Sequence, residues 1–246
     1  MSRYPPDIRS GGNDHGQPGV DVVGSHETRP EEARLPAAAS ETHLSLRAEF
    51  DRQVDTFVQL DYPSLAGTSR DTFVRRLAPL ADAAAALTVR GDERIPFVVV
   101  PGEAVVSRTQ AIARTQMNGR AGFTSMDGDD LKRFTPIADV AIPASPYLLL
   151  DVDTGSDLLD VIPDEALPRI IATRRSPITI DEGLALITQF PGILRTRNCF
   201  SMLASRCGDR RVPALWVSNG RPRLGWCWAA APHSWLGSAS CASRVG

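Results

Sequence analysis

The residues best suited to chemistry gather in one stretch of the chain, from Arg195 to Cys241. His233 lies in it, together with every cysteine and every tryptophan. The cysteines are Cys199, Cys207, Cys227 and Cys241, and the tryptophans are Trp216, Trp226, Trp228 and Trp235. Thiols, an imidazole and indole rings can supply a nucleophile, a base and stacking surfaces. We therefore expect any functional site to be built from this stretch.

One interpretation pairs a thiol with an imidazole. Asn198 can cap a short helix over residues 199–206, which would place Cys199 in the first turn, where the helix dipole lowers a thiol pKa. His233 follows after predicted strands, which is the order of papain-like and transglutaminase-like enzymes. No acidic residue follows His233 to orient its ring, and no oxyanion donor can be named. A thiol hydrolase or transferase, with Cys199 as nucleophile and His233 as base, is thus the alternative to a protein without catalytic activity.

A second interpretation uses the basic residues of a predicted hairpin that carries tryptophans. Arginines interleaved with aromatic rings suit a nucleotide or single-stranded nucleic acid, although hairpin tryptophans more often pack into a core. We expect a small anionic ligand rather than nucleic acid, which the sequence leaves open as the less favoured partner. The ligand-binding candidates are Arg210, Arg211, Arg223 and Trp228.

Neither the cysteines nor the acidic loop Asp151–Asp157 matches a known site fully. Structural zinc sites use two cysteines two to four residues apart, and here no pair is closer than Cys199 and Cys207, so we predict no metal. The loop DVDTGSD is similar to the catalytic turn of aspartic proteases, to the nucleophile loop of haloacid-dehalogenase-type phosphatases and to a calcium loop. It lacks the second Asp-Thr-Gly of the first, the Gly-Thr order of the second and the closing glutamate of the third. A strand that ends in a polar glycine turn explains it without chemistry.

Composition indicates a globular chain, because 42% of the 246 residues are hydrophobic and 23% are charged. The net charge of −2 hides an asymmetry: residues 195–246 hold eight arginines and one acid, so this segment carries +7 and the rest −9. No apolar run is long enough to span a membrane, and the N-terminus has no secretory apolar region. We predict a cytoplasmic protein with reduced thiols. The sequence names no cofactor and leaves the oligomeric state open.

The elements that position these residues follow from hydrophobic periodicity and caps. We predict a disordered tail over residues 1–40 and a single α/β (mixed α+β) domain over residues 41–246, with helices packed on a mixed sheet. Apolar spacing from residue 43 onwards predicts a first helix, and Thr179 with Glu182 forms a capping box for a later one. The clearest strands are Ile95–Val100 and Tyr147–Val152, and Asn219-Gly220 indicates a hairpin between strands Val212–Ser218 and Arg223–Ala229, with a loop longer than two residues.

Three segments of the chain resemble an uncharacterised actinobacterial family of domains of unknown function. They are LDVDTG, TIDEGLALITQFPGILRTRNCFSMLASRCGDRRVPALWVSNG and GWCWAAAPHSWLGSASC. The resemblance covers roughly residues 45–246. It implies one structural unit of actinobacterial, cytoplasmic origin and brings no catalytic residues with it. The function expected from all of this is a non-catalytic or regulatory ligand-binding module that uses the basic, Trp-rich segment 195–246. A structural or protein-interaction domain is a further alternative.

Overall fold

The computed structural model describes residues 35–88, 94–102, 105–144 and 146–246. Chain contacts separate Met1–Leu35 from one compact unit, Pro36–Gly246, and only the second unit is described below. Most of the predicted disordered tail lies outside the described residues, and the first helix begins at Leu35, within the last part of that prediction.

The described residues form eight α-helices and two 3₁₀ turns. They are α1 (Leu35–Gln59), α2 (Tyr62–Leu65), α3 (Arg70–Leu77), α4 (Leu80–Ala85), α5 (Arg108–Arg114), α6 (Gly128–Lys132), η1 (Ser156–Leu158), α7 (Pro163–Ala172), α8 (Ile180–Gln189) and η2 (Pro191–Ile193). None of these helices combines the length and the apolar character that a membrane crossing requires.

The longer strands form two sheets. One has the order β1–β6–β14, from β1 (Ile95–Val100), β6 (Tyr147–Val152) and β14 (Ser243–Val245). The other has the order β12–β8–β10–β11–β4, from β12 (Leu236–Ser238), β8 (Cys199–Ser201), β10 (Arg211–Ser218), β11 (Arg221–Trp228) and β4 (Phe123–Thr124). The remaining described strands pair two by two: β13 (Ser240–Cys241) with β7 (Ser176–Pro177), β2 (Gln116–Met117) with β3 (Arg120–Ala121), and β5 (Thr135–Pro136) with β9 (Ser205–Arg206). Parallel and antiparallel pairs occur together in the five-stranded sheet, so the predicted mixed α+β fold is confirmed.

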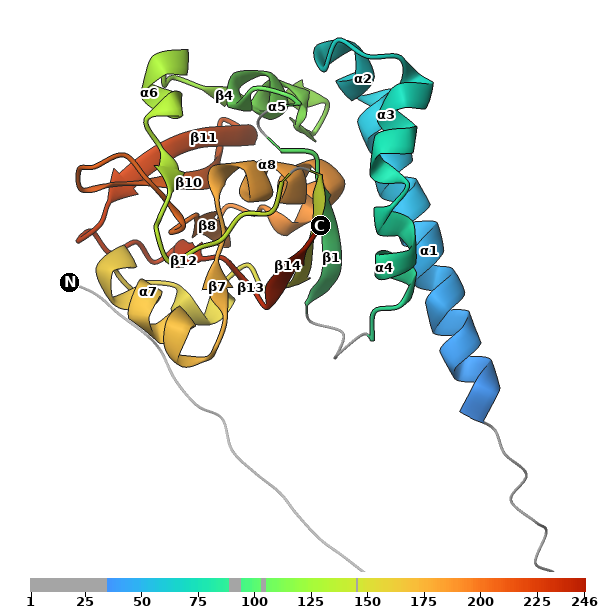
Figure 1. The fold of residues 1–246 in the computed structure, drawn as a ribbon. Helices are drawn as coiled ribbons and strands as arrows, with labels where there is room; N and C mark the ends of the chain where they lie inside the picture. The colour runs from blue at the N-terminus through green and yellow to red at the C-terminus, as the bar shows by residue number, and fades with distance from the viewer. Residues whose placement is uncertain (1–34, 89–93, 103–104, 145) are drawn as a thin grey trace, which may run out of the picture. The chain divides into compact units, whose positions relative to one another are not determined.

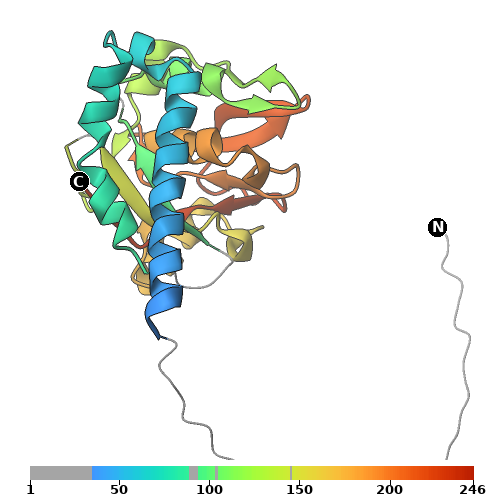
Figure 2. The ribbon, with the colours of Figure 1, turned by 90° about the vertical axis from the view of Figure 1, so that its right-hand side faces the viewer.

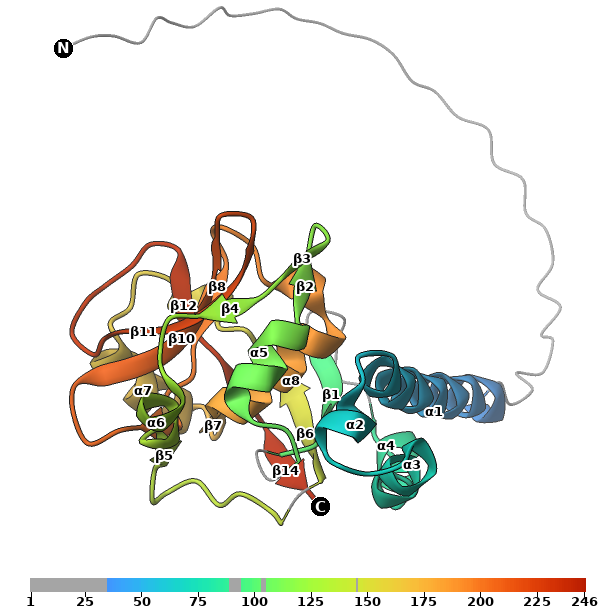
Figure 3. The same cartoon turned by 90° about the horizontal axis from the view of Figure 1, so that it is seen from above.

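Helix α8 lies between the two sheets and forms the centre of the core (Figures 1 and 3). All its residues except Asp181 are buried, which is the pattern of a helix apolar on every side. Gly183 is needed where α8 meets the five-stranded sheet, since a methyl group there would lie 2.2 Å from the sulfur of Met202. The predicted capping box at Thr179 and Glu182 is present and begins this helix.

Glu182 also holds the C-terminal strand, β14, to the core. Its fully buried carboxylate accepts hydrogen bonds from the Tyr147 hydroxyl (3.0 Å), from two nitrogens of Arg244 (2.5 and 2.8 Å) and from the Thr179 amide (2.7 Å). Burial, together with the adjacent Glu182 carboxylate, raises the pKa of the Tyr147 hydroxyl well above its ordinary value. The charge is therefore paired and saturated with hydrogen bonds, as a buried ion must be.

The first four helices cover the outer side of the three-stranded sheet, and α1 runs along it in Figure 2. The predicted apolar face of α1 is confirmed, with Leu46, Phe50, Val54 and Phe57 buried. A buried polar residue of this helix, Gln53, meets the open edge of β1. Its amide nitrogen donates to the Phe97 carbonyl (3.1 Å), and its amide oxygen accepts from the Val99 N–H (2.8 Å). Gln53 thereby satisfies two edge groups that would otherwise lack partners.

The predicted strands Ile95–Val100 and Tyr147–Val152 match β1 and β6 to the residue. The predicted helix over residues 199–206 is wrong, because Cys199–Ser201 and Ser205–Arg206 are strands β8 and β9. The apolar run from Cys199 to Ala204 is buried on all sides, and a short continuous apolar run fits a buried strand as well as a helix. Pairing of β8 with both β10 and β12 settles the choice.

Candidate functional site

The β10–β11 hairpin is the scaffold of the candidate site. Ser218 pairs with Arg221, so the connection has two residues, and the predicted longer loop is wrong. Asn219 (φ 51°) and Gly220 (φ 70°) both adopt left-handed backbone conformations. Two such residues in a two-residue loop make the turn whose twist matches that of the flanking strands. The tight turn fixes the register and hence the face on which each tryptophan lies.

Trp216 packs closely on this hairpin because Gly225, which its ring contacts, has no side chain. Its strand neighbour Ala214 pairs with Gly225, and a methyl group on Gly225 would lie 2.3 Å from the Trp216 ring. The segment after β11 returns over the same region, and the Trp235 ring lies 6.3 Å from that of Trp216, centroid to centroid. The His233 ring in turn lies 5.0 Å from that of Trp235, with an interplanar angle of 31°.

Together these residues line a solvent-open hollow of about 330 Å³, here called the tryptophan pocket. This volume is at the lower end of the range for small-molecule sites. Its lining consists of Ala214, Trp216, Trp226, Cys227, Trp228, Ala231, His233, Trp235 and Leu236. Aromatic side chains dominate that lining, and none of its residues carries a fixed charge. Trp228 is 52% exposed, so this ring remains accessible from solvent at the pocket.

The arginines predicted to bind a ligand have different surroundings. Arg211 is held by Asp130 (2.8 Å) and Asp209 (3.0 Å), which raise the pKa of its guanidinium, and Arg210 lies 3.5 Å from Asp164. Arg223 has no such carboxylate partner among the described residues, and its guanidinium lies 5.2 Å from the centroid of Trp216. Of the four predicted ligand-binding residues, Trp228 lines the pocket and Arg223 adjoins it through Trp216. Arg210 and Arg211 are engaged elsewhere in ion pairs.

Cys199 lies in the sheet beneath the aromatic rings. Leu215 pairs with Phe200, which places Cys199 beside Trp216 at the next position of the ladder. The side chain is 1% exposed, and its Sγ donates to the Arg195 carbonyl (3.1 Å). Burial raises the pKa of this thiol, and no helix terminus is present to lower it. The physical basis expected for a reactive Cys199 is therefore missing.

His233 is placed by backbone bonds and by stacking. Its carbonyl accepts from the Asp160 amide (3.1 Å) and the Leu236 amide (3.1 Å), and its ring packs on Trp235. The thiol that shares the tryptophan pocket with it is Cys227. Burial raises the pKa of Cys227 to about 11, so this thiol is protonated at neutral pH. Sequence reasoning did not pair these two residues, although only five positions separate them.

The comparison with protein families gives a match across most of the chain. The model of a family of unknown function, DUF5701, matches residues 56–246. The chain belongs to the DUF5701 family. No curated protein and no solved structure matches it. The DUF5701 match contains every residue of the tryptophan pocket, whereas most of α1 precedes it. The predicted resemblance to a family of unknown function is confirmed, and the actinobacterial origin stays a prediction.

The acidic loop of this DUF5701 chain forms a strand-terminal turn held by ion pairs. Asp151 binds Arg175 (2.7 Å) and Arg94 (3.2 Å), and Asp153 accepts from the Gly155 amide (2.7 Å). A methyl group on Gly155 would lie 2.1 Å from the Ser238 carbonyl oxygen, so the turn also makes a close backbone contact with β12. These contacts account for the Asp-Thr-Gly sequence. A cavity of about 190 Å³ beside it is lined by arginines and aspartates that largely neutralise one another.

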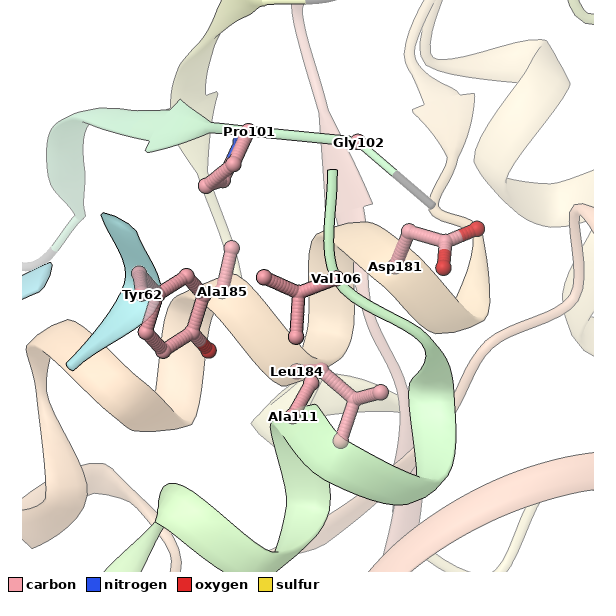
Figure 4. A pocket seen from close by; sticks show the side chains of 8 residues that line it. All are labelled: Tyr62, Pro101, Gly102, Val106, Ala111, Asp181, Leu184 and Ala185. Carbon is pink, nitrogen blue, oxygen red and sulfur yellow. The ribbon is translucent and has the colours of Figure 1, made fainter. Parts of the chain in front are cut away.

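Two other features carry less weight. The cavity in Figure 4, between α2, the end of β1, α5 and α8, has a volume of about 20 Å³, enough for little more than one water. Within the described part of the chain, no cluster of three or more histidine, cysteine or acidic residues has the arrangement of a metal site, and all four cysteines are free. The tryptophan pocket is therefore the strongest candidate site.

Proposed function

We propose that this chain is a ligand-binding module and that its tryptophan pocket takes the planar ring of a small anionic ligand. One observation carries the proposal: all four tryptophans and His233 converge on a single cavity of about 330 Å³. They come from β10, from β11 and from the segment before β12, so the sheet and its covering loop both contribute. A largely apolar hollow of this size with an exposed indole at its wall is the kind of concave surface that small ligands occupy.

The lining favours a flat, largely apolar group. Offset or edge contacts between aromatic rings contribute about 0.5–1.5 kcal/mol each beyond area burial. The ring centroids of Trp226 and Trp228 lie 4.7 Å apart with an interplanar angle of 67°, so the two rings face in different directions. Two such contacts with a bound ring would add about 1–3 kcal/mol to its burial.

The surrounding charge favours an anion. Arg211 lies 5.6 Å from the centroid of Trp226, and Arg223 lies 5.2 Å from that of Trp216. Neither arginine lines the pocket. Asp130 and Asp209 neutralise Arg211, so Arg223, which has no carboxylate partner among the described residues, brings the positive charge to the pocket wall. Aromatic cages that bind quaternary ammonium groups gain from electron-rich ring faces, and guanidinium groups on those rings oppose such a cation. A ring that carries a phosphate, sulfonate or carboxylate fits these walls better.

The thiols support binding rather than catalysis. Burial raises the pKa of both Cys227 and Cys199, and Cys199 is 1% exposed, so neither offers the accessible thiolate that nucleophilic catalysis needs. Four free, buried cysteines also suit the reducing cytoplasm that the sequence predicts.

Two probes test the proposal: 8-anilinonaphthalene-1-sulfonate, a planar aromatic anion, and adenosine 5′-monophosphate. We expect both to change tryptophan fluorescence and to bind with a stoichiometry of one in calorimetry. Trp228→Ala should weaken binding about 5-fold or more, because one stacking partner is lost. The exposed Ile171, which is 53% accessible on α7, gives a matched control, and Ile171→Ala should bind both probes like the wild type. Absence of binding by both probes at millimolar concentration overturns the proposal.

A further inference from the structure

The stacking of aromatic rings continues beyond the tryptophan pocket. Arg223 lies 5.2 Å from the Trp216 ring centroid and 5.5 Å from that of Phe123 on β4. Arg221 lies 4.0 Å from the centroid of the same Phe123 ring. Trp235, Trp216, Arg223, Phe123 and Arg221 thus form a continuous series of ring and cation–π contacts, here called the arginine–aromatic row.

The strand register explains why these residues form a row. Trp216 pairs with Arg223 across the hairpin, and Arg223 pairs with Phe123 in the parallel contact between β11 and β4. On the other side, β8 lies between β10 and β12, and Leu236 pairs with Cys199 just after Trp235. The row therefore lies over β10, β11 and β4 and reaches Trp235 in the segment before β12. Its successive contacts of 6.3 Å (Trp235 to Trp216), 5.2 Å (Trp216 to Arg223) and 5.5 Å (Arg223 to Phe123) make the row longer than one nucleotide requires.

Arg221 and Arg223 have most of their hydrogen-bonding capacity unused. Neither forms an ion pair with any described residue, and the single hydrogen bond found for them joins Arg223 to the Ser125 hydroxyl (3.1 Å). The Nε atoms of both are buried and have no partner. A guanidinium offers five N–H donors in one plane, and stacking on aromatic faces fixes that plane without using them. The aromatic contacts thus hold both guanidinium groups in place while the terminal nitrogens of Arg221, and all but one hydrogen bond of Arg223, stay available for a ligand.

More positive charge lies at the same end of the sheet. Arg120 donates to the Asn219 carbonyl at the hairpin turn. Arg195 and Arg197 are exposed in the turn that leads into β8, and β8 pairs with Ala214 and Leu215 in the middle of β10. None of these three arginines forms an ion pair within the described residues. The carboxylates that neutralise Arg210 and Arg211 contact the opposite end of the hairpin, where β10 begins.

We propose that the arginine–aromatic row binds single-stranded nucleic acid. One base enters the tryptophan pocket, and the strand continues across Trp216 and Phe123 with its phosphates on Arg221, Arg223 and the neighbouring arginines. Stacked aromatic rings with interleaved arginines are what sequence-tolerant single-strand binding uses. A duplex keeps its bases stacked on one another and cannot present one to the pocket. This inference rests on the proposed function, since it takes the pocket as the place of one base.

The test compares the hexanucleotides rA6 and dA6 with adenosine 5′-monophosphate and with a 12-base-pair DNA duplex, by fluorescence anisotropy and tryptophan quenching. We expect a hexanucleotide to bind at least 10-fold more tightly than the mononucleotide and the duplex. The logarithm of its binding constant should fall with the logarithm of salt concentration with a slope of about −1.4 or steeper, from at least two phosphate contacts. A comparison of the affinities of rA6 and dA6 tells whether the 2′-hydroxyl contributes to binding.

Variants assign the contacts. Arg221→Gln with Arg223→Gln should make the salt slope less steep by about 1.4 and leave mononucleotide quenching nearly unchanged. Arg221→Lys with Arg223→Lys keeps both charges and should retain the slope, which separates a phosphate contact from a loss of folding. Trp228→Ala should weaken both the hexanucleotide and the mononucleotide. The control is Arg75→Gln with Arg76→Gln, two exposed arginines of α3, which should change nothing.

The outcomes distinguish the two proposals. If the mononucleotide binds and the hexanucleotide binds no more tightly, the row does not hold a strand, and the pocket proposal stands alone. If the duplex binds as well as the hexanucleotide, the contact is a charge effect only and the inference is overturned. If the hexanucleotide, the mononucleotide and 8-anilinonaphthalene-1-sulfonate all fail to bind, both proposals fail together.

Discussion

Replacement of Gly225 by alanine tests the geometry on which the tryptophan pocket depends. The added methyl carbon would lie 2.3 Å from the Trp216 ring, whereas carbon atoms make their best contact at about 3.5 Å. The indole must therefore move by about 1.2 Å away from the sheet. Trp235 lies on its neighbouring side, 6.3 Å between centroids, so the movement compresses the pocket rather than opening solvent space.

The expected loss of stability follows from two opposing terms. Forcing a methyl group into an occupied space costs about 1–3 kcal/mol. Alanine gains about 0.5–1 kcal/mol over glycine in a strand, because the unfolded chain has fewer conformations to lose. The net effect is a loss of up to about 2.5 kcal/mol in the free energy of unfolding. For a unit of this size, that lowers the melting temperature by up to about 10 °C.

Urea unfolding, with melting followed by circular dichroism, measures this loss, and near-ultraviolet circular dichroism reports the packing of the indoles. Gly128→Ala is the matched control, since a methyl group there meets nothing within 4 Å. The control should be neutral or slightly stabilising. If Gly225→Ala keeps both the wild-type stability and the wild-type aromatic spectrum, then Trp216 does not lie on Gly225, and the pocket described above does not exist in that form.

Two further predictions concern buried charge and buried thiols. Glu182→Gln should lower the free energy of unfolding by about 3 kcal/mol, because it leaves the Arg244 charge buried without its partner. The control Glu165→Gln, at an exposed helical ion pair, should change it by less than about 0.5 kcal/mol. Equal effects of the two substitutions in urea unfolding would contradict this. Burial raises the pKa of Cys241 to about 12 from an ordinary value of 9.0, so the thiol is protonated in the folded chain where it ionises in the unfolded one. The stability gained from the protonated thiol is complete below pH 9 and is lost between pH 9 and 12. The free energy of unfolding of Cys241→Ala should therefore fall less steeply than that of the wild type over this interval. If the two proteins show parallel pH profiles, the assignment is refuted.

Local signals in the sequence predicted much of the fold. The strands β1 and β6 are short β-branched or apolar runs closed by turn residues, and α8 has its capping box, so each is specified by its own neighbours. Cys199–Ser201 is different. Its apolar run fits a helix or a strand, and pairing with β12, more than 30 residues later, decides between them.

The sequence indicated the segment that forms the tryptophan pocket, while the ligand-binding roles of its residues stay predictions. Aromatic density indicated the segment, and Trp228 lines the pocket as an expected ligand-binding residue. The expected roles of Arg210 and Arg211 stay predictions, and nearby sequence could not show that Asp164 and Asp130 bind them, because those acids come from distant segments. The importance of Arg221 is equally hidden, since Phe123 lies almost 100 positions away in the chain.

The order in which the chain is synthesised matters for the contact between Gln53 and β1. A ribosome delivers α1 before β1, so the amide that closes the strand edge exists before the edge does. A nascent sheet is at greatest risk of pairing with another copy while its edge is uncovered. Here the protective side chain is already present on a helix when the strand emerges. Separate production of the later part of the chain, from Arg94 onwards, would remove that protection, and the exposed strand would then be free to recruit a second molecule.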